Sequence, residues 1–389
     1  MIKIENDDID KIVDNYKNLL TDIFSNKFSA IEKVGSFLLS KKVITKKDVE
    51  GKFTYYTGAL KLLMNLSDLH NSKHLKGKGK KTADLVYTIN KLKIKTTKKS
   101  SCRKTKNIKA TITKVNKLKD FMGANDLFGA GPKELLSLND NLKTALEPVS
   151  NRFYNHFFNY QNYYGPINNG IGKALDIKTC PYCNRNYVTY IPDNTKHIIG
   201  PSYDHFYIKS KYKYISLSFY NLIPSCFVCN SNLKGVVDFN LDYHVHPYLG
   251  DFGKDVAFDF NLVTVDFLYN KKIIFEPFLV ESENISVKNR NRVFGNVNVK
   301  DSGSINVFKL NDIYASHNDS VEEIYKRFEK NGTYYLGSIS QFIKKLNTSE
   351  EEFYRYTFRN YFNESDFNNR PLAKLDKDIY LKMKMIAES

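Results

Sequence analysis

Four of the five cysteines in this chain form two C-x-x-C pairs with metal-ligand spacing. The pairs are Cys180-Pro-Tyr-Cys183 and Cys226-Phe-Val-Cys229, and the remaining cysteine, Cys102, lies far from both. Two such pairs supply four thiolates, the donor set of a tetrahedral zinc site. Four thiolates leave no coordination position open for water or substrate. The sequence therefore predicts a structural zinc and places any catalysis on other residues.

Residues with a second kind of chemistry lie between and directly after these pairs. Asp204-His205 stands between the pairs, and Asn230 follows the last cysteine. Carboxylate and amide oxygens suit Mg²⁺, a hard ion that keeps several waters and binds substrate phosphate. A neutral imidazole beside such an ion is a general base for an attacking water. Singly, these residues are more often a half-buried histidine, a turn residue and a helix cap, so the prediction depends on their combination.

The intervening sequence predicts a small ββα unit that positions these groups. The runs 187–191 and 197–199 are rich in β-branched and aromatic residues and flank a turn at 192–195, which predicts a β-hairpin. The stretch 230–234 predicts a short helix directly after the second cysteine pair. Zinc would hold the start of this helix against the hairpin, which brings the aspartate, the histidine and the asparagine onto one face.

A longer order of residues runs through this stretch: Asp204-His205, then Asn221-Leu222, then Cys226-x-x-Cys229-Asn230-x-x-x-Lys234. This order resembles the HNH, or ββα-metal, endonuclease family in its zinc-bearing form. The amino-acid sequence of this stretch is similar to that of bacterial HNH proteins often encoded beside ATPases in anti-phage systems. The order of its motifs also resembles that of the phage junction-resolving endonuclease VII. The close resemblance covers about residues 175 to 250.

The resemblance implies a role for each site residue. His205 is the expected general base, Asp204 and Asn230 the expected Mg²⁺ ligands, and Asn221 the residue that braces the loop carrying the base. Asn230 replaces the final histidine of the family name, which favours Mg²⁺ or Mn²⁺ over a softer ion. The implied activity is hydrolysis of DNA phosphodiester bonds that leaves 5′ phosphate and 3′ hydroxyl ends. The implied setting is an anti-phage defence effector whose ATPase subunit, if there is one, is a separate chain.

Two other functions fit the same residues. A zinc-knuckle module would bind nucleic acid without cutting it, and an RNase would use the same site on RNA. Lys234 lies four residues past Asn230 on the same helical face, either to reach a phosphate or as a solvated lysine. His244-Val-His246 alternates along a candidate strand, either as additional ligands or as structural histidines.

Positive charge is concentrated in one segment. Residues 73–119 contain sixteen lysines and one arginine against a single aspartate, which accounts for almost the whole formal charge of +17. A block of this kind predicts a surface for a polyanion, with DNA as the first candidate, and the alternative is a solvated basic loop. The lysines expected to contact nucleic acid here are Lys76, Lys78, Lys80, Lys81, Lys98 and Lys99.

The chain of 389 residues is long enough for several regions in an α+β arrangement. The expected regions are a helical N-terminal region (1–70), the Lys-rich segment (71–120), a helical connector (121–174), the zinc-stapled, treble-clef-like nuclease unit (175–250) and a mixed strand and helix region (251–389). Helical spacing marks 9–24 and 53–64, and a capping box stands at Thr45 and Asp48. We expect the aromatic run 153–164 to pack against the nuclease unit rather than to stack on bases.

In the C-terminal region the pattern changes along the chain. Alternation or β-rich composition predicts strands over 256–262, 273–275, 285–287 and 305–308. Helical spacing predicts helices over 321–328, 353–362 and 372–385. Neither a long apolar run nor a signal-peptide pattern is present, so we expect a cytoplasmic protein without membrane contact, where reduced thiols suit zinc. The sequence does not indicate an oligomeric state.

Overall fold

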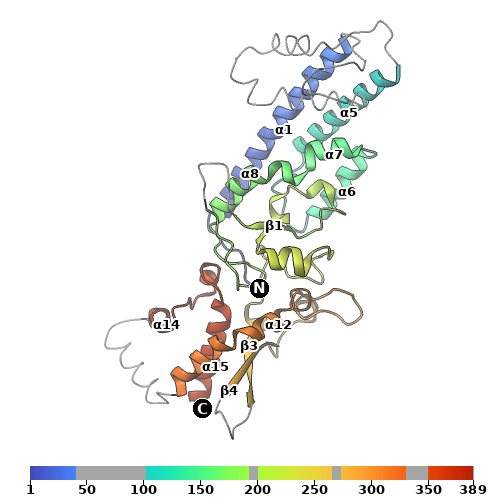
Figure 1. Ribbon diagram of the computed structural model, residues 1–389. Helices are drawn as coiled ribbons and strands as arrows, with labels where there is room; N and C mark the ends of the chain where they lie inside the picture. Colours follow the sequence, from blue (N-terminus) through green and yellow to red (C-terminus); the bar gives the residue numbers. More distant parts are fainter. Residues whose placement is uncertain (41–101, 192–199, 265–272, 330–348, 389) are drawn as a thin grey trace, which may run out of the picture.

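The computed structural model describes residues 1–40, 102–191, 200–264, 273–329 and 349–388. It is a mixed α/β protein in which helices surround two small antiparallel sheets, β1-β2 and β3-β4. Figure 1 shows an elongated molecule, with helices α1 and α5 at one end and β3, β4 and α15 at the other. Within the described residues, no helix is both long enough and apolar enough to cross a membrane.

The N-terminal end is helical because apolar residues recur at helical spacing. Helix α1 (Ile9–Ser40) buries Tyr16, Leu20 and Phe24 on one face. It packs against α5 (Cys102–Ala124), which in turn contacts α6 (Leu135–Leu146). The predicted helix over 9–24 is confirmed, while the predicted helix over 53–64 and the capping box at Thr45 and Asp48 lie outside the described residues.

The connector between these helices and the first cysteine pair is also helical. Helix α7 (Asn151–Phe158) begins at Ser150, whose side chain accepts a hydrogen bond from the backbone of Phe153. Short helical turns follow as η1 (Tyr160–Tyr163), α8 (Tyr164–Ile167), η2 (Asn168–Gly172) and α9 (Lys173–Leu175). Most aromatic residues of this run pack in the core, as predicted: Phe153, Phe157, Phe158 and Tyr163 are buried.

The central part contains the sheet that carries the aspartate and the histidine. Strand β1 (Ser202–His205) pairs antiparallel with β2 (Leu222–Ser225), so that Asp204 lies opposite Ile223 and His205 opposite Leu222. Turns η3 (Lys213–Ile215) and η4 (Phe219–Asn221) lie in the loop between the strands. The π-helical segment η5 (Val228–Lys234) follows β2. Figure 1 shows this part between the N-terminal helices and the C-terminal region.

The predicted hairpin lies partly outside the described residues and stays a prediction. In the run 187–191, Tyr187 forms an isolated bridge with Thr179, and the run 197–199 lies outside the described residues. Among the described residues of this part, the paired strands are Ser202–His205 and Leu222–Ser225. Their sequences show no alternation of apolar and polar residues, because both faces of each strand are covered. Three of the four residues of β1 and all four of β2 are buried. Burial on both faces, rather than intrinsic β-propensity, determines this pairing.

The C-terminal region contains a longer hairpin. Strands β3 (Val256–Thr264) and β4 (Ile273–Glu281) pair along their whole length, which confirms the strands predicted over 256–262 and 273–275. Helix α15 (Ala373–Glu388) packs against β3, and α12 (Leu310–Tyr314) packs against β4. A short turn, η6 (Gly253–Asp255), leads into β3.

Two predicted strands of this region are helices. Residues 285–287 lead into α10 (Val287–Val293), because the Ser286 side chain accepts a hydrogen bond from the backbone of Asn289 and caps a helix. Residues 305–308 belong mainly to α11 (Ser304–Val307), which follows Gly303 at a φ of 83°. In both cases local turn chemistry overrides short β-branched runs.

The predicted helices of the C-terminal region are present, but the one predicted over 353–362 ends at Phe358, because Arg359 has a left-handed backbone with a φ of 56°. A helix covers 318–329, preceded by η7 (Ala315–His317). Helix α14 (Glu350–Phe358) begins with a capping box formed by Ser349 and Glu352, and η8 (Glu364–Asn369) lies between α14 and α15. One continuous hydrophobic core runs from the N-terminal helices through the central sheet to α15.

Candidate metal centre and polar pocket

The two cysteine pairs come together into one buried cluster. The sulfurs of Cys180, Cys183, Cys226 and Cys229 all lie within 4.8 Å of one another, and the Cys183 and Cys226 sulfurs are 4.0 Å apart. Tetrahedral zinc with Zn–S bonds of about 2.3 Å requires sulfurs about 3.8 Å apart. The four buried cysteines are therefore positioned to bind a metal ion, which is consistent with a structural zinc.

Hydrogen bonds stabilise a thiolate at one of the four cysteines, Cys226. The side-chain amide of Asn186 donates to the sulfur of Cys226 at 3.3 Å, and the backbone N–H of Cys229 donates to the same sulfur at 3.5 Å. Hydrogen bonding to the neighbouring sulfurs, that of Cys180 first, lowers the pKa of the Cys226 thiol. Metal binding requires deprotonated cysteines, and the hydrogen bonds at Cys226 suit that role. Burial raises the pKa of Cys180, and the neighbouring sulfurs, that of Cys180 first, raise the pKa of Cys229.

The first cysteine pair also anchors the C-terminal region. Asn184, directly after Cys183, has a left-handed backbone with a φ of 47°. Its side-chain nitrogen donates to the carbonyl oxygens of Phe367 and Arg370 at 2.9 and 3.2 Å. Its own carbonyl accepts from the backbone of Leu372 at 2.7 Å. The segment before α15 is thus fixed directly to the cysteine cluster.

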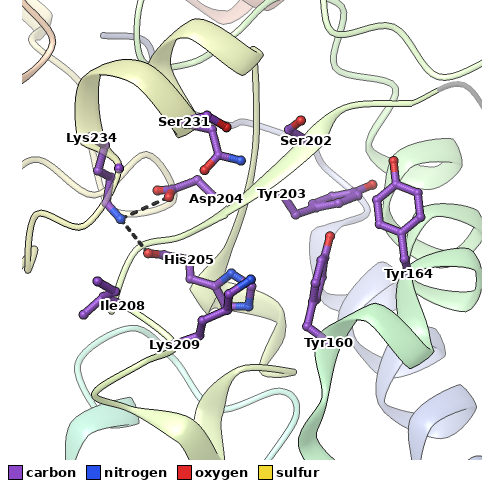
Figure 2. Close-up of a pocket in the computed structure, with 12 residues that line it drawn as sticks. Tyr160, Tyr164, Ser202, Tyr203, Asp204, His205, Ile208, Lys209, Ser231 and Lys234 are labelled. Carbon is purple, nitrogen blue, oxygen red and sulfur yellow. Dashed lines mark hydrogen bonds and ion pairs between the residues drawn. The ribbon is translucent and has the colours of Figure 1, made fainter.

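A polar pocket lies beside the cluster, between β1, η5 and the connector. Its volume is about 350 Å³. Figure 2 shows Asp204 and Lys234 on one side of the strand and the His205 ring, with Lys209 and Tyr160, on the other. The pocket is lined by Tyr160, Tyr164, Ser202, Tyr203, Asp204, His205, Ile208, Lys209, Asn230, Ser231, Lys234 and Gly235.

His205 is held in one defined tautomer. Its Nε2 lies 2.9 Å from the carbonyl oxygen of Ser216. Because a carbonyl oxygen only accepts, Nε2 carries the hydrogen and Nδ1 of the neutral ring has a free lone pair. Burial lowers the pKa of His205 to about 3, and the positive charge of Lys209 acts in the same direction. The edge of the Tyr160 ring, with centroids 4.9 Å apart, also fixes the imidazole plane.

Asn221 ties together the two ends of the loop that supplies this carbonyl. Its side-chain oxygen accepts from the backbone of Tyr207 at 2.7 Å. Its nitrogen donates to the carbonyl oxygens of Tyr207 and Ile215 at 3.2 and 3.1 Å. Asn221 is fully buried, so these backbone groups have no water to replace it. The amide thereby fixes the position of the residue next to Ser216.

Asp204 receives hydrogen bonds on both carboxylate oxygens. The hydroxyl of Tyr182 donates to Oδ2 at 2.7 Å, and the ammonium of Lys234 donates to Oδ1 at 3.0 Å. Burial and the neighbouring Asp204 charge raise the pKa of Tyr182, so its hydroxyl stays protonated and acts as the donor. Lys234 also donates to the carbonyl oxygen of His205 at 2.7 Å. Lys234 is therefore neither solvated nor free.

Asn230 lines the same pocket and is half-buried. Among the described residues, no partner hydrogen-bonds to its side-chain amide. Together with Asp204 it offers carboxylate and amide oxygens to one pocket, a donor set of the kind that Mg²⁺ and Mn²⁺ take. The pocket therefore contains two residues of the types that bind such an ion.

The remaining predicted residues are the lysines of the basic segment and two histidines. Lys76, Lys78, Lys80, Lys81, Lys98 and Lys99 lie outside the described residues. His244 donates from Nε2 to the carbonyl of Asp301 at 2.9 Å and stacks on Phe239, and His246 packs against Phe206. Neither histidine lines the pocket or belongs to the cysteine cluster. Both have structural roles here.

Several site residues had no signal in the sequence. Tyr182 lies inside the first C-x-x-C pair, but its contact with Asp204 depends on tertiary packing. Lys209 is an exposed lysine of the pocket in a lysine-rich chain, so its position was not distinctive. Ser216 acts through its backbone carbonyl, which every residue possesses.

Comparisons of this chain with protein-family models, with curated proteins and with solved structures found no match. A function for the chain therefore has to be argued from the cysteine cluster and the pocket beside it.

Proposed function

We propose that this protein is a metal-dependent endonuclease of the HNH type that hydrolyses phosphodiester bonds in DNA. The observation that carries the proposal is a single pocket that combines His205, neutral and with Nδ1 free, with the oxygen donors Asp204 and Asn230. These residue types in one pocket supply a general base and a site for a hard divalent ion. The order of strand β1, strand β2 and helix η5 around a cysteine cluster supports a ββα-metal unit of the zinc-bearing form.

Asp204 and Asn230 would hold Mg²⁺ or Mn²⁺ in this pocket. When bound, the ion would neutralise the phosphate and stabilise the charge that develops on the departing 3′ oxygen. The hydrogen bond from Tyr182 orients the Asp204 carboxylate, and the buried cysteine cluster keeps Tyr182 in place. The structural metal site thus supports the pocket without taking part in the reaction.

His205 would take the proton from the attacking water at Nδ1. The carbonyl of Ser216 keeps the hydrogen on Nε2 and accepts a stronger hydrogen bond when the ring becomes charged. Burial and Lys209 lower the pKa of His205 in the free protein, whereas the negative charge of a bound phosphodiester acts in the opposite direction. Substrate binding therefore raises the basicity of the imidazole toward the value that general-base catalysis needs.

Lys209 is the exposed cation at the rim of the pocket and would contact a phosphate of the substrate. The Lys-rich segment 73–119 would add affinity through further phosphate contacts. A defence role and a separate ATPase partner are part of the same proposal, and they rest on the sequence resemblance alone.

A nicking assay tests the proposal against its two alternatives. Supercoiled plasmid and labelled RNA are incubated with the zinc-loaded protein with and without Mg²⁺, beside His205→Ala. A DNA nuclease nicks the plasmid only with Mg²⁺ and only with His205. Preferential cleavage of RNA would identify an RNase, and binding without any cleavage would identify a nucleic-acid-binding module.

A further inference from the structure

Lys234 is a buried lysine whose ammonium lies in the candidate metal pocket. Its side chain is 1% exposed, and Nζ lies 3.0 Å from Oδ1 of Asp204 and 2.7 Å from the carbonyl oxygen of His205. The ring of Phe239 faces the ammonium, with its centroid 4.8 Å away. A carboxylate, a carbonyl and an aromatic face are all groups that attract positive charge. The protein has therefore placed one of its own cations beside the carboxylate expected to bind a divalent ion.

The burial of this ion pair distinguishes it from a surface pair nearby. Lys211 and Asp238 are 2.6 Å apart, but their side chains are 60% and 40% exposed. Water and salt screen a pair of that kind, so it contributes little. The pair of Lys234 and Asp204 is shielded from water, so the ammonium acts on the carboxylate with little attenuation.

We propose that Lys234 is an internal competitor of the divalent metal, because its ammonium neutralises Asp204 in the metal-free protein and lowers the affinity of the pocket for Mg²⁺ or Mn²⁺. The inference rests on the proposed function, since it concerns the same Asp204 site. A divalent ion at Asp204 must lie close to a fixed positive charge, and like charges repel strongly where water is excluded. The pocket binds its metal weakly until an additional negative charge, such as a substrate phosphate, offsets the ammonium.

A scaffolding role for Lys234 predicts a change of opposite sign. If the lysine only orients Asp204, its removal frees the carboxylate to rotate and weakens metal binding. If the lysine competes with the metal, its removal leaves an uncompensated carboxylate and strengthens metal binding. The direction of the change in metal affinity therefore separates the two roles.

The experiment measures Mn²⁺ binding to the zinc-loaded full chain without nucleic acid. Free Mn²⁺ is quantified by electron paramagnetic resonance for the wild type, Lys234→Met, Lys234→Arg, Lys211→Met and Asp204→Asn. Lys234→Met is expected to bind Mn²⁺ at least about tenfold more tightly than the wild type. Lys234→Arg keeps the charge and should stay near the wild type. Lys211→Met removes one exposed lysine and should change affinity less than about twofold.

A measurement on the unaltered protein covers the case in which Lys234→Met does not fold. Lysine ammonium resonances are followed by ¹⁵N NMR during a Mg²⁺ titration, with Lys234→Arg assigning the signal. A Lys234 signal that shifts or disappears as Mg²⁺ binds supports competition, and an unchanged signal at saturation overturns it. Equal or weaker Mn²⁺ binding by folded Lys234→Met also overturns it.

These outcomes are distinct from a failure of the proposed function. If the wild type binds Mn²⁺ and Asp204→Asn loses that binding, the metal site at Asp204 is supported, whatever the Mn²⁺ affinity of Lys234→Met. If neither the wild type nor Lys234→Met binds Mn²⁺, both the metal site and the competition are overturned together.

Discussion

The hydroxyl of Tyr182 donates a hydrogen bond of 2.7 Å to Oδ2 of Asp204. Tyr182 lies between the two cysteines of the first pair, and Asp204 lies in strand β1 at the edge of the pocket. The contact links the cysteine cluster to the carboxylate expected to bind the catalytic ion. The state of the structural metal site should therefore determine the state of the pocket.

The first prediction concerns the cysteine cluster. The purified protein should contain one zinc per chain, and Cys229→Ser should lose both zinc and cleavage, because metal binding contributes folding free energy directly. Elemental analysis and circular dichroism provide the measurement. Tyr182→Phe is the matched variant that should keep zinc and fold while cleaving at least about tenfold more slowly. Normal folding with less than about half an equivalent of zinc would contradict the structural role.

A second prediction separates the base from the oxygen ligands. His205→Ala should reduce nicking by orders of magnitude at every metal concentration, with fold, zinc content and DNA affinity retained. Asp204→Ala and Asn230→Ala should instead retain residual activity that shifts to higher Mg²⁺ or Mn²⁺. Nicking rates across a metal titration decide the matter. Cleavage at the wild-type rate by His205→Ala would end the assignment of a base to this residue.

The third prediction concerns the bracing amide. Asn221→Ala removes three hydrogen bonds to buried backbone groups of Tyr207 and Ile215. The free energy of unfolding should fall by about 3 kcal/mol, since buried polar groups lose their partners. Urea denaturation of the zinc-loaded protein measures this. Asn162→Ala, which removes one exposed hydrogen bond to the carbonyl of Asn155, is the control and should cost under about 1 kcal/mol. Equal losses of stability for both variants would show that the buried hydrogen bonds of Asn221 contribute no more than the exposed hydrogen bond of Asn162.

A fourth prediction tests the exposed cation of the pocket. Lys209→Ala should weaken DNA binding severalfold and reduce the slope of affinity against salt by about one, as for the loss of one phosphate contact. Lys211→Ala should change neither, because that lysine is paired with Asp238 at 2.6 Å. Fluorescence anisotropy across a salt series compares the two. An unchanged slope in Lys209→Ala would place the substrate backbone elsewhere.

The fifth prediction concerns the pH dependence of stability. Burial lowers the pKa of His246 to about 3, whereas the unfolded histidine titrates near its ordinary 6.5. Between these values the unfolded chain binds a proton that the folded chain does not, so the free energy of unfolding falls as the pH falls below 6.5. The slope due to His246 is at most about 1.4 kcal/mol per pH unit.

His246→Phe should remove that part of the slope. The loss of the hydrogen bond from the backbone N–H of Tyr248 to Nδ1 should lower stability by a similar amount at every pH, so the slope rather than the absolute stability is compared. The phenylalanine fits the apolar neighbourhood of Phe206, whose ring centroid is 4.2 Å from that of His246. Urea denaturation at pH 7.5, 6.5 and 5.5 gives the comparison. His205 and His244, whose pKa values burial also lowers, act equally in both proteins and cancel in the difference. If the free energy of unfolding changes equally with pH in the two proteins, His246 does not contribute to the pH dependence of stability.

The cysteine cluster and much of the helical framework could be predicted from the sequence alone. C-x-x-C spacing is a local constraint, since two residues between ligands suffice to point both sulfurs at one centre. Helical periodicity over 9–24 and 372–385 is also local, because one apolar face is repeated over several turns. Hydrophobic alternation identified β3, and the short β-branched and aromatic run 273–275 identified the start of β4. The signals that failed, at 285–287 and 305–308, were short and lay next to helix caps or glycine.

The arrangement of the pocket depends on long-range packing and could not be predicted from the sequence. Strand β1 is four residues long and pairs with β2 across a loop of sixteen residues, so no local pattern marks it. The tautomer of His205 depends on the backbone carbonyl of Ser216, and the environment of Asp204 depends on Tyr182 and Lys234. Lys234 shows the limit most clearly. From the sequence, a lysine in a helix is predicted to be solvated or to bind phosphate. Lys234 is buried instead, because its burial depends on which other parts of the chain pack over it.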